Sequence, residues 1–206
     1  MKKALVFSLA AMAVGVAQAQ YFAGVEVGSA RTSLGSATSE IESFYVDLFQ
    51  SPATASYDKS VTSFRSFGGT ALNSKTNIEV GYVNFGDANI NVQTNFVGFN
   101  IAQQVTFANS GFDVSALYQP FDNGFYVKGG LHATKSEFDV KTFVNSSLGS
   151  VVSGSESGVG LLYGLGYQAA VAEGLNVRAS IVRYQNLGGE SDSEMDFISL
   201  GVSKSF

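Results

Sequence analysis

The chain has 206 residues, with 12 basic and 17 acidic side chains and a formal net charge of −5. This acidic balance argues against nucleic acid or an anionic bilayer surface as a partner. There is no cysteine, which excludes a disulfide framework and a thiolate metal site. The length fits a single domain.

The N-terminus has the three parts of a secretory signal peptide. Lys2 and Lys3 form a basic region, residues 4–16 form an apolar region, and an Ala-Gln-Ala cleavage site follows. The apolar run is too short for a membrane anchor, and no later run reaches the length of a spanning helix. We therefore expect residues 1–19 to be removed on export. The mature chain would then start at Gln20 with 12 − 2 = 10 basic residues against 17 acidic, a net charge of −7.

Seven segments alternate between apolar residues on one side and glycine, polar or charged residues on the other, which is the period of a β-strand. They are residues 21–29, 77–83, 112–118, 127–133, 158–168, 175–181 and 195–206. The apolar side of the last segment consists of Ile198, Leu200, Val202 and Phe206. We expect an eighth strand at 64–71, where the register is ambiguous because Arg65 and a glycine pair fit either side.

An apolar outer side and a polar inner side suit a wall between lipid and a wet interior. A soluble β-sandwich could show the same alternation, with its apolar side buried between two sheets. The export signal, a C-terminal Phe206 of the kind read by the outer-membrane assembly machinery, and aromatic residues near strand ends favour the membrane wall. These aromatic residues are Tyr21, Phe85, Phe112, Tyr118, Phe125, Tyr167 and Phe206.

The connections between the expected strands alternate in length. Residues 72–75, 119–124 and 170–174 form tight turns rich in Asn, Gly and Pro. Long polar connections are expected near 31–62, 86–110 and 135–156, and a shorter acidic one at 187–193. This order predicts an all-β, eight-stranded antiparallel up-and-down transmembrane β-barrel with periplasmic turns and long extracellular loops.

Within the second long connection, residues 89–106 alternate in places. We interpret these residues as a β-extension or a short helix within the loop, in preference to a further membrane strand. In the first connection, residues 39–50 could form a short amphipathic segment through Phe44, Tyr45, Leu48 and Phe49. Such a segment would pack within the loop or expose an adhesive or lipid-touching patch.

Three motifs resemble the small eight-stranded outer-membrane barrels of the outer membrane protein A family. They are residues 79–87, residues 111–131 and the C-terminal 199–203 with its final Phe206. The resemblance covers the transmembrane domain alone, from Tyr21 to Phe206, so we do not expect the peptidoglycan-binding function of the family here. It implies insertion into the outer membrane of a Gram-negative bacterium, with outer-membrane lipid and the barrel-assembly machinery as partners. Residues Ile198, Leu200, Val202 and Phe206 would form the assembly signal.

Members of this family often carry interior charges that bridge the lumen. By position, Glu26, Glu79, Lys128 and Arg178 would supply them here. Such a lumen charge cluster would either fill a narrow lumen with paired charges or gate an ion path. Ser180 stands where an acidic residue is common, and Lys204 stands where an aromatic residue is usual.

Other residue patterns give little sign of chemistry. His132, the only histidine, is followed by Thr134, but the strand register points it into the lumen, away from any lipid substrate. The glycines of 158–166 superficially resemble a phosphate loop but lack its lysine, and they fit close packing inside a narrow barrel better. No spacing of ligand residues suggests a metal, and no cofactor is expected.

The sequence therefore predicts a non-enzymatic outer-membrane protein with a structural, surface-presenting role. Its loops would mediate adhesion to a host or surface ligand. A narrow pore for small solutes is the alternative. An outer-membrane lipid hydrolase is a third reading, ranked below both.

Overall fold

The computed structural model describes residues 20–32, 43, 46–47, 53–96, 98–191 and 193–206. They include nine strands and one short 3₁₀ helix, η2 (Leu187–Gly189), and Ser43, Val46 and Asp47 are helical as well. The strands are β1 (Tyr21–Thr32), β2 (Ala53–Tyr57), β3 (Val61–Asn73), β4 (Thr76–Phe96), β5 (Phe99–Tyr118), β6 (Phe125–Val144), β7 (Ser147–Ala172), β8 (Leu175–Gln185) and β9 (Glu194–Ser205). No helix among these residues has the length and apolar character needed to span a membrane.

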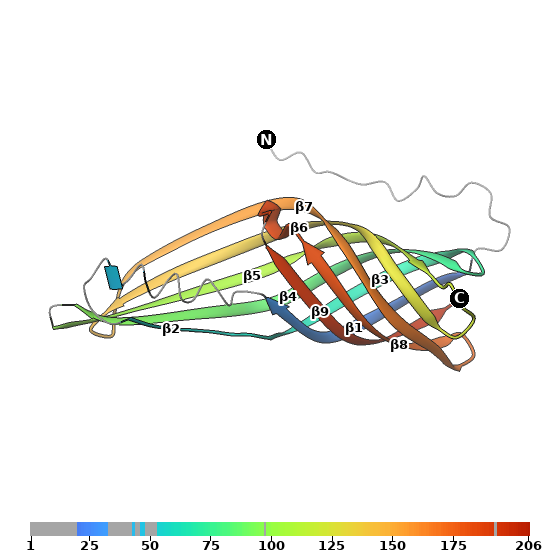
Figure 1. Ribbon diagram of the computed structural model, residues 1–206, viewed down its shortest axis with the longest axis horizontal. Helices are drawn as coiled ribbons and strands as arrows, with labels where there is room; N and C mark the ends of the chain where they lie inside the picture. The colour runs from blue at the N-terminus through green and yellow to red at the C-terminus, as the bar shows by residue number, and fades with distance from the viewer. Residues whose placement is uncertain (1–19, 33–42, 44–45, 48–52, 97, 192) are drawn as a thin grey trace.

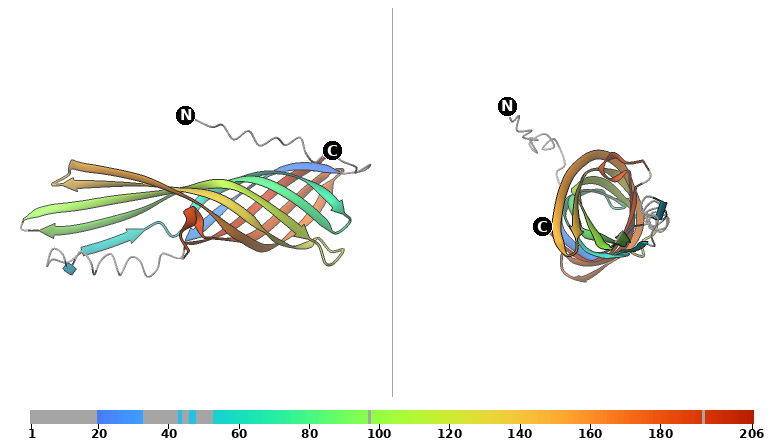
Figure 2. Two further views of the ribbon diagram at one scale, coloured as in Figure 1. Left: turned by 90° about the horizontal axis from the view of Figure 1, so that it is seen from above. Right: turned by 90° about the vertical axis from the view of Figure 1, so that its left-hand side faces the viewer.

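Eight strands close into a ring by antiparallel pairing in the order β1, β3, β4, β5, β6, β7, β8, β9 and back to β1 (Figure 1). The end-on view in Figure 2 shows the closed outline. Closure satisfies the backbone of every ring strand on both sides, as a sheet in lipid requires. The expected eight-stranded antiparallel barrel is therefore confirmed. Strand β2 lies outside the ring and pairs only with residues 90–94 of β4.

The apolar sides of the strands face outward from the barrel. Val27 is 57% exposed, Val159 is 65% exposed and Leu200 is 71% exposed. The charged and small residues between them face inward and are mostly buried. This arrangement decides between a barrel and a sandwich, because a sandwich would bury these aliphatic side chains between two sheets. It also resolves the register of β3, in which Arg65 and Phe67 are buried and Phe64 is exposed.

The glycines of the inner face make room for large inward side chains. A Cβ on Gly81 would lie 2.6 Å from Nε of Arg65, and a Cβ on Gly160 would lie 2.5 Å from Nε2 of His132. Likewise, a Cβ on Gly201 would lie 2.6 Å from Cγ of Glu26. The close-packing interpretation of the inward glycines is therefore confirmed, since each of these sites accommodates a neighbouring side chain that a methyl group would displace.

The second and third long connections are strands, which corrects the expectation of loops at 86–110 and 135–156. β4 and β5 remain paired as far as Phe96 and Phe99, and β6 and β7 as far as Val144 and Ser147. A short helix within 89–106 was therefore the wrong alternative, and the β-extension was the right one. The reason is that alternation resumes after a bulge between Asn84 and Asp87, so the ladder continues beyond the ring.

These continuations form one sheet beyond the ring, which we call the protruding sheet. It consists of β2, residues 87–96 of β4, 99–110 of β5, 135–144 of β6 and 147–157 of β7. Figures 1 and 2 show it as the long extension at one end of the molecule, where β1, β8 and β9 have already ended. Two predictions fall outside the described residues: the signal peptide at 1–19, and the amphipathic segment with Phe44, Tyr45, Leu48 and Phe49 in the first connection.

Candidate functional site

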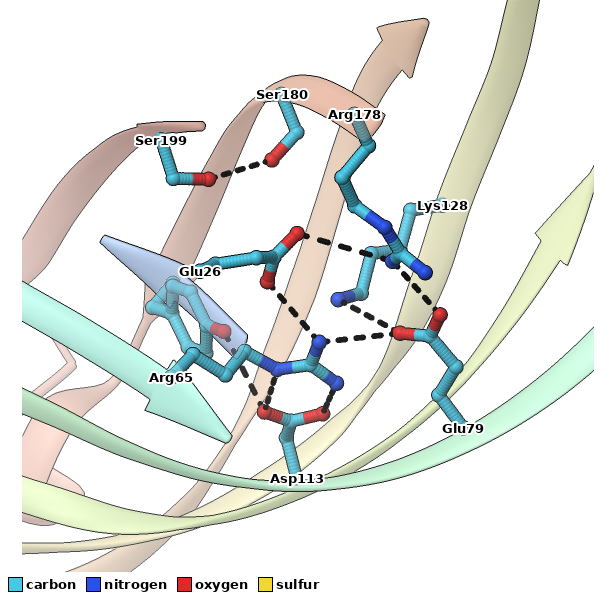
Figure 3. A network of polar contacts seen from close by, with 9 residues as sticks. Glu26, Arg65, Glu79, Asp113, Lys128, Arg178, Ser180 and Ser199 are labelled. Carbon is cyan, nitrogen blue, oxygen red and sulfur yellow. Dashed lines mark hydrogen bonds and ion pairs between the residues drawn. The ribbon is translucent and has the colours of Figure 1, made fainter. Parts of the chain in front are cut away.

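Six charged side chains from six ring strands meet in the middle of the lumen (Figure 3). They are Glu26 of β1, Arg65 of β3, Glu79 of β4, Asp113 of β5, Lys128 of β6 and Arg178 of β8. All six are buried. Three carboxylates face three cations, so this lumen charge cluster has no net charge. Neutrality matters because an unpaired charge in an enclosed lumen would carry a large desolvation penalty.

Arg65 is the centre of the lumen charge cluster. Its Nε and Nη2 donate to the two carboxylate oxygens of Asp113 at 2.8 and 2.7 Å. Its Nη1 donates to Glu26 at 3.1 Å and to Glu79 at 3.0 Å. One guanidinium therefore joins three carboxylates from three strands, and its Nε–Nη2 edge forms a bidentate pair, the strongest geometry available to arginine.

The other two cations complete the cluster around Glu79. Nη1 of Arg178 donates to Oε1 of Glu79 at 2.7 Å and lies 3.7 Å from Glu26. Nζ of Lys128 lies 3.6 Å from Oε2 of Glu79. The ring of Phe67 lies 5.0 Å from the guanidinium carbon of Arg65 and 4.1 Å from that of Arg178, which adds cation–π contacts.

The four residues selected from sequence, Glu26, Glu79, Lys128 and Arg178, thus lie in one cluster. Sequence reasoning did not include Arg65 and Asp113 in it, although Arg65 is the most connected member. Alternation already placed Asp113 inward. The direction of Arg65 could not be read, because the register of β3 was ambiguous, so the sequence gave no partner for Asp113. Ser180, where an acidic residue was the family expectation, instead hydrogen-bonds Ser199 at 2.9 Å.

A second obstruction, made of apolar side chains, fills the lumen toward the η2 end. This lumen apolar cluster consists of Ala30, Val83, Phe85, Leu162, Val182, Tyr184, Leu187, Met195 and Phe197. The ring of Phe85 lies 4.9 Å from that of Tyr184 and 6.3 Å from that of Phe197, both edge-on. Leu187 of η2 packs into the cluster, so the connection between β8 and β9 closes over the barrel interior.

The two clusters close the lumen at successive levels, which argues against an open path for solutes. We expect the purified protein in planar bilayers to give no large, persistent conductance steps. Glu79→Gln and Arg178→Gln are expected to leave this baseline unchanged, because charge removal does not remove the apolar cluster. Stable steps in the wild-type recording, altered by either substitution, would establish the narrow pore instead.

His132 is enclosed and serves to hold the β8–β9 connection. One ring nitrogen, Nε2, lies 2.7 Å from the carbonyl oxygen of Gln185, and Nδ1 lies 3.4 Å from the hydroxyl of Thr134. The same hydroxyl accepts a hydrogen bond from the backbone N–H of Gly188 at 3.1 Å. His132 is buried and points into the barrel, away from lipid. Across the described residues, no group of His, Asp and Glu is arranged to hold a metal ion.

A half-buried ion pair lies on the outer surface near the end of the barrel that carries η2. Arg183 of β8 donates through Nε and Nη2 to both oxygens of Asp196 of β9, at 2.7 and 2.8 Å, and also pairs with Glu194 at 3.1 Å. These outward-facing charges lie beyond the lipid-facing band, since hydrocarbon would not solvate them. The hydrogen bonds from Arg183 lower the pKa of Asp196 below its ordinary value.

The last strand carries its apolar residues on the outer surface. Ile198, Leu200, Val202 and Phe206 are all exposed, and the backbone N–H of Phe206 donates to the carbonyl of Tyr21 at 2.8 Å. Their use as an assembly signal stays a prediction. Lys204 lies on the same surface, and its ammonium donates to the carbonyl of Glu173 at 3.0 Å. The charge is thereby held at the turn rather than against the apolar band.

Comparison with known proteins identifies the barrel. Residues 4–206 match the family described as outer membrane protein beta-barrel domain. The chain belongs to this family. An outer membrane β-barrel of this kind resides in the bacterial outer membrane, which is the location predicted from sequence. No curated protein is significantly similar to the chain in sequence.

Solved structures of other outer membrane β-barrels resemble it in fold. Ail, the attachment invasion locus protein of Yersinia pestis, superimposes with a TM-score of 0.52 at 14% identity, over 91% of this chain and 99% of Ail. OprG of Pseudomonas aeruginosa gives a TM-score of 0.48 at 12% identity, over 89% of this chain and 95% of OprG. At such identity the likeness to Ail shows the fold alone.

Proposed function

We propose that this outer membrane β-barrel holds the protruding sheet outside the cell and presents it to a binding partner, without catalysing a reaction. The observation that carries the proposal is the continuation of β4 to β7 beyond the other strands (Figure 2). The short turns and the described chain ends, Gln20 and Phe206, lie at the opposite end, which in such barrels faces the periplasm. The protruding sheet would therefore meet host surfaces or other cells.

One edge of the protruding sheet supports this proposal. β7 pairs with β6 along its length, but with β8 only from Leu162 to Ala172. Among the described strands, none pairs with the other side of β7 between Ser147 and Leu161. Such a row of unpaired backbone N–H and C=O groups is a template onto which an extended segment of a partner protein can add as a further strand.

The composition of this edge leaves it open to pairing. Residues 147–157 contain no lysine, arginine or proline, which natural proteins use to protect sheet edges, and Glu156 is their only charge. Leu148, Val151 and Val152 are 58%, 51% and 58% exposed. The opposite edge of the sheet is β2, a strand of five residues, whereas the unpaired side of β7 includes residues 147–157. The β7 edge is therefore the longer template for a partner strand.

Shortening the β6–β7 hairpin tests the proposed function. Glu137 and Ser155 are cross-strand partners, so replacing residues 138–154 by an Asn-Gly turn should retain the barrel and remove the edge. We expect bacteria carrying this variant to lose at least tenfold in adherence to extracellular matrix or cultured cells. Unchanged heat-modifiability on unboiled gels would show that the barrel still folds.

A matched pair of variants distinguishes the contribution of the β7 edge to adherence from that of the outer face of the sheet. Val151→Lys together with Ser153→Lys adds protecting charges to the edge and should also reduce adherence. Lys135→Ala, on the outer face of the same sheet, should leave adherence unchanged. If the shortened barrel folds and adheres as well as the wild type, the surface-presenting function is wrong.

The lipid hydrolase finds no support, because His132 faces away from lipid.

A further inference from the structure

The two faces of the protruding sheet differ in chemistry where they reach the unpaired edge of β7. One cross-strand row, on the face that continues the inner side of the barrel, is entirely apolar and consists of Ile90, Val105, Val140 and Val152. The neighbouring row on the outer face consists of Asn91, Gln104, Lys141 and Val151. Directly opposite residues of an antiparallel sheet share a face. A partner strand therefore continues the apolar row if it places an apolar residue beside Val152.

The same segment of a second copy supplies that residue. Residues 147–157 are centred on Val152, which is 58% exposed. If two copies of this segment pair antiparallel about a two-fold axis at Val152, the two Val152 side chains lie directly opposite each other. Ser150 then opposes Gly154 of the other copy, so no bulky side chains meet beside them. The apolar row runs unbroken through both sheets.

The charge of the segment also permits self-pairing. Glu156 is the only charged residue between 147 and 157, and it lies 156 − 152 = 4 residues from the axis. The two Glu156 carboxylates would therefore be about 26 Å apart along the strands, at about 3.3 Å per residue. This separation exceeds the screening length of about 8 Å at physiological salt, so the like charges would not oppose the contact.

The direction of β7 determines where the second copy would lie. Figures 1 and 2 show the continuation of β7 extending along the long axis of the molecule, away from the barrel. An antiparallel partner strand runs the opposite way, so its barrel lies at the far end of the pair. The two barrels would then occupy two facing membranes.

Pairing within one membrane does not match the faces. Two copies in the same membrane have parallel β7 strands, and a two-fold axis along these strands joins the inner face of one copy to the outer face of the other. The apolar row would then meet the row that contains Lys141. A head-to-tail arrangement would instead pair β7 with β2, which has only five residues.

We propose that the β7 edge pairs with the β7 edge of a second copy in a facing outer membrane, so that the protein joins cells of the same kind. This inference rests on the proposed surface-presenting function and names its partner as this chain itself. A single pair of strands buries little surface, so one contact is weak. Many copies on two opposed membranes act together, and their avidity exceeds the affinity of one contact.

Vesicle aggregation tests the self-pairing. The purified barrel is reconstituted into two batches of phosphatidylcholine vesicles with different fluorophores, and aggregation is measured by two-colour fluorescence cross-correlation. We expect protein-bearing vesicles to aggregate with one another and not with protein-free vesicles. Val152→Lys in both batches should reduce aggregation at least tenfold, because identical charges then face each other across the axis, and Val152→Glu should do the same.

The decisive measurement mixes the two variants. Vesicles with Val152→Lys and vesicles with Val152→Glu should aggregate with each other to within about threefold of the wild type, since opposite charges then meet at the axis. Thr54→Lys, at an exposed position of the other edge strand β2, is the matched control and should aggregate like the wild type. Heat-modifiability on unboiled gels would show that every variant is folded.

Four outcomes would overturn the inference: no aggregation of wild-type vesicles, equal aggregation with protein-free vesicles, an equal loss in Thr54→Lys, or no recovery when the two Val152 variants are mixed. The vesicles contain no host component, so this failure is distinct from failure of the proposed function. Absent vesicle aggregation, with adherence to cultured cells still lost on shortening the β6–β7 hairpin, would exclude self-pairing and leave the surface-presenting function standing.

Discussion

Arg65→Met is expected to lower the free energy of unfolding by about 3–5 kcal/mol, the range for breaking a buried ion pair. Arg65 is 0% exposed, and its guanidinium binds Glu26, Glu79 and Asp113. Methionine fills much of the same volume but supplies no donor. Three carboxylates would then share two cations in an enclosed space, and Asp113 would lose both hydrogen bonds that Arg65 donates to it.

Reversible urea unfolding of the barrel in lipid vesicles would measure this loss. Arg183→Met is the matched control, because Arg183 makes the same bidentate geometry with Asp196 on the outer surface. Exposed pairs contribute about 1 kcal/mol or less, so this control should change stability little. Equal effects of the two substitutions would contradict the central role of Arg65 in the lumen charge cluster.

Phe85→Ala is expected to lower the free energy of unfolding by about 3–5 kcal/mol, the range for deleting a fully buried aromatic side chain. Phe85 is completely buried between Tyr184 and Phe197 in the lumen apolar cluster. Strands on both sides hold the backbone in the closed ring, so the neighbouring side chains cannot move in to fill the space. A cavity therefore remains, and the lost contacts are not replaced.

The same unfolding experiment applies, with Phe99→Ala as its control. Phe99 has the same side chain, but it is exposed in the protruding sheet, where truncation leaves no cavity. We expect a change within about 0.5 kcal/mol for this surface site. If Phe85→Ala were as mild as Phe99→Ala, the apolar cluster could not be a closely packed obstruction, and the case for a closed lumen would weaken.

A closed lumen and a protruding sheet together support the proposed surface-presenting role over a channel. The lumen charge cluster bridges β1, β3, β4, β5, β6 and β8, so it ties opposite walls of the barrel together. A rigid barrel of this kind supports β4, β5, β6 and β7, which continue beyond the lipid-facing part of the barrel. In the proposed function, the partner would bind at the edge of β7 and not in the lumen.

Period-2 alternation was sufficient to predict the ring strands and, for seven of the eight, the side to which each residue points. A residue in a strand can point only to one of two sides, so an apolar row such as Ile198, Leu200 and Val202 specifies the outward side of β9. The same rule placed Glu26 and Arg178 inside. In β3 the rule was not decisive, because Arg65 and the glycines beside it fit either side, and only pairing with β1 and β4 resolved it.

The length of the strands was not predicted, because polarity was taken as a sign of loops. Beyond the membrane both sides of a sheet meet water, so the contrast between the sides of residues 99–110 and 135–144 is weaker than in the ring. Ser and Asn in such segments resemble loop composition, yet the backbone ladder is retained. Sequence alone also gave no sign that β2 and β7 would be the two edge strands of this sheet.

The amino-acid sequence by itself was enough to predict the ring of eight strands and, outside β3, the side on which each ring residue lies, because these depend on local periodicity. Only the tertiary structure decided that Arg65 joins three carboxylates and that an apolar cluster closes the lumen above them. Such facts depend on which strands become neighbours across the barrel. Contacts between residues far apart in the chain leave no periodic trace in its sequence.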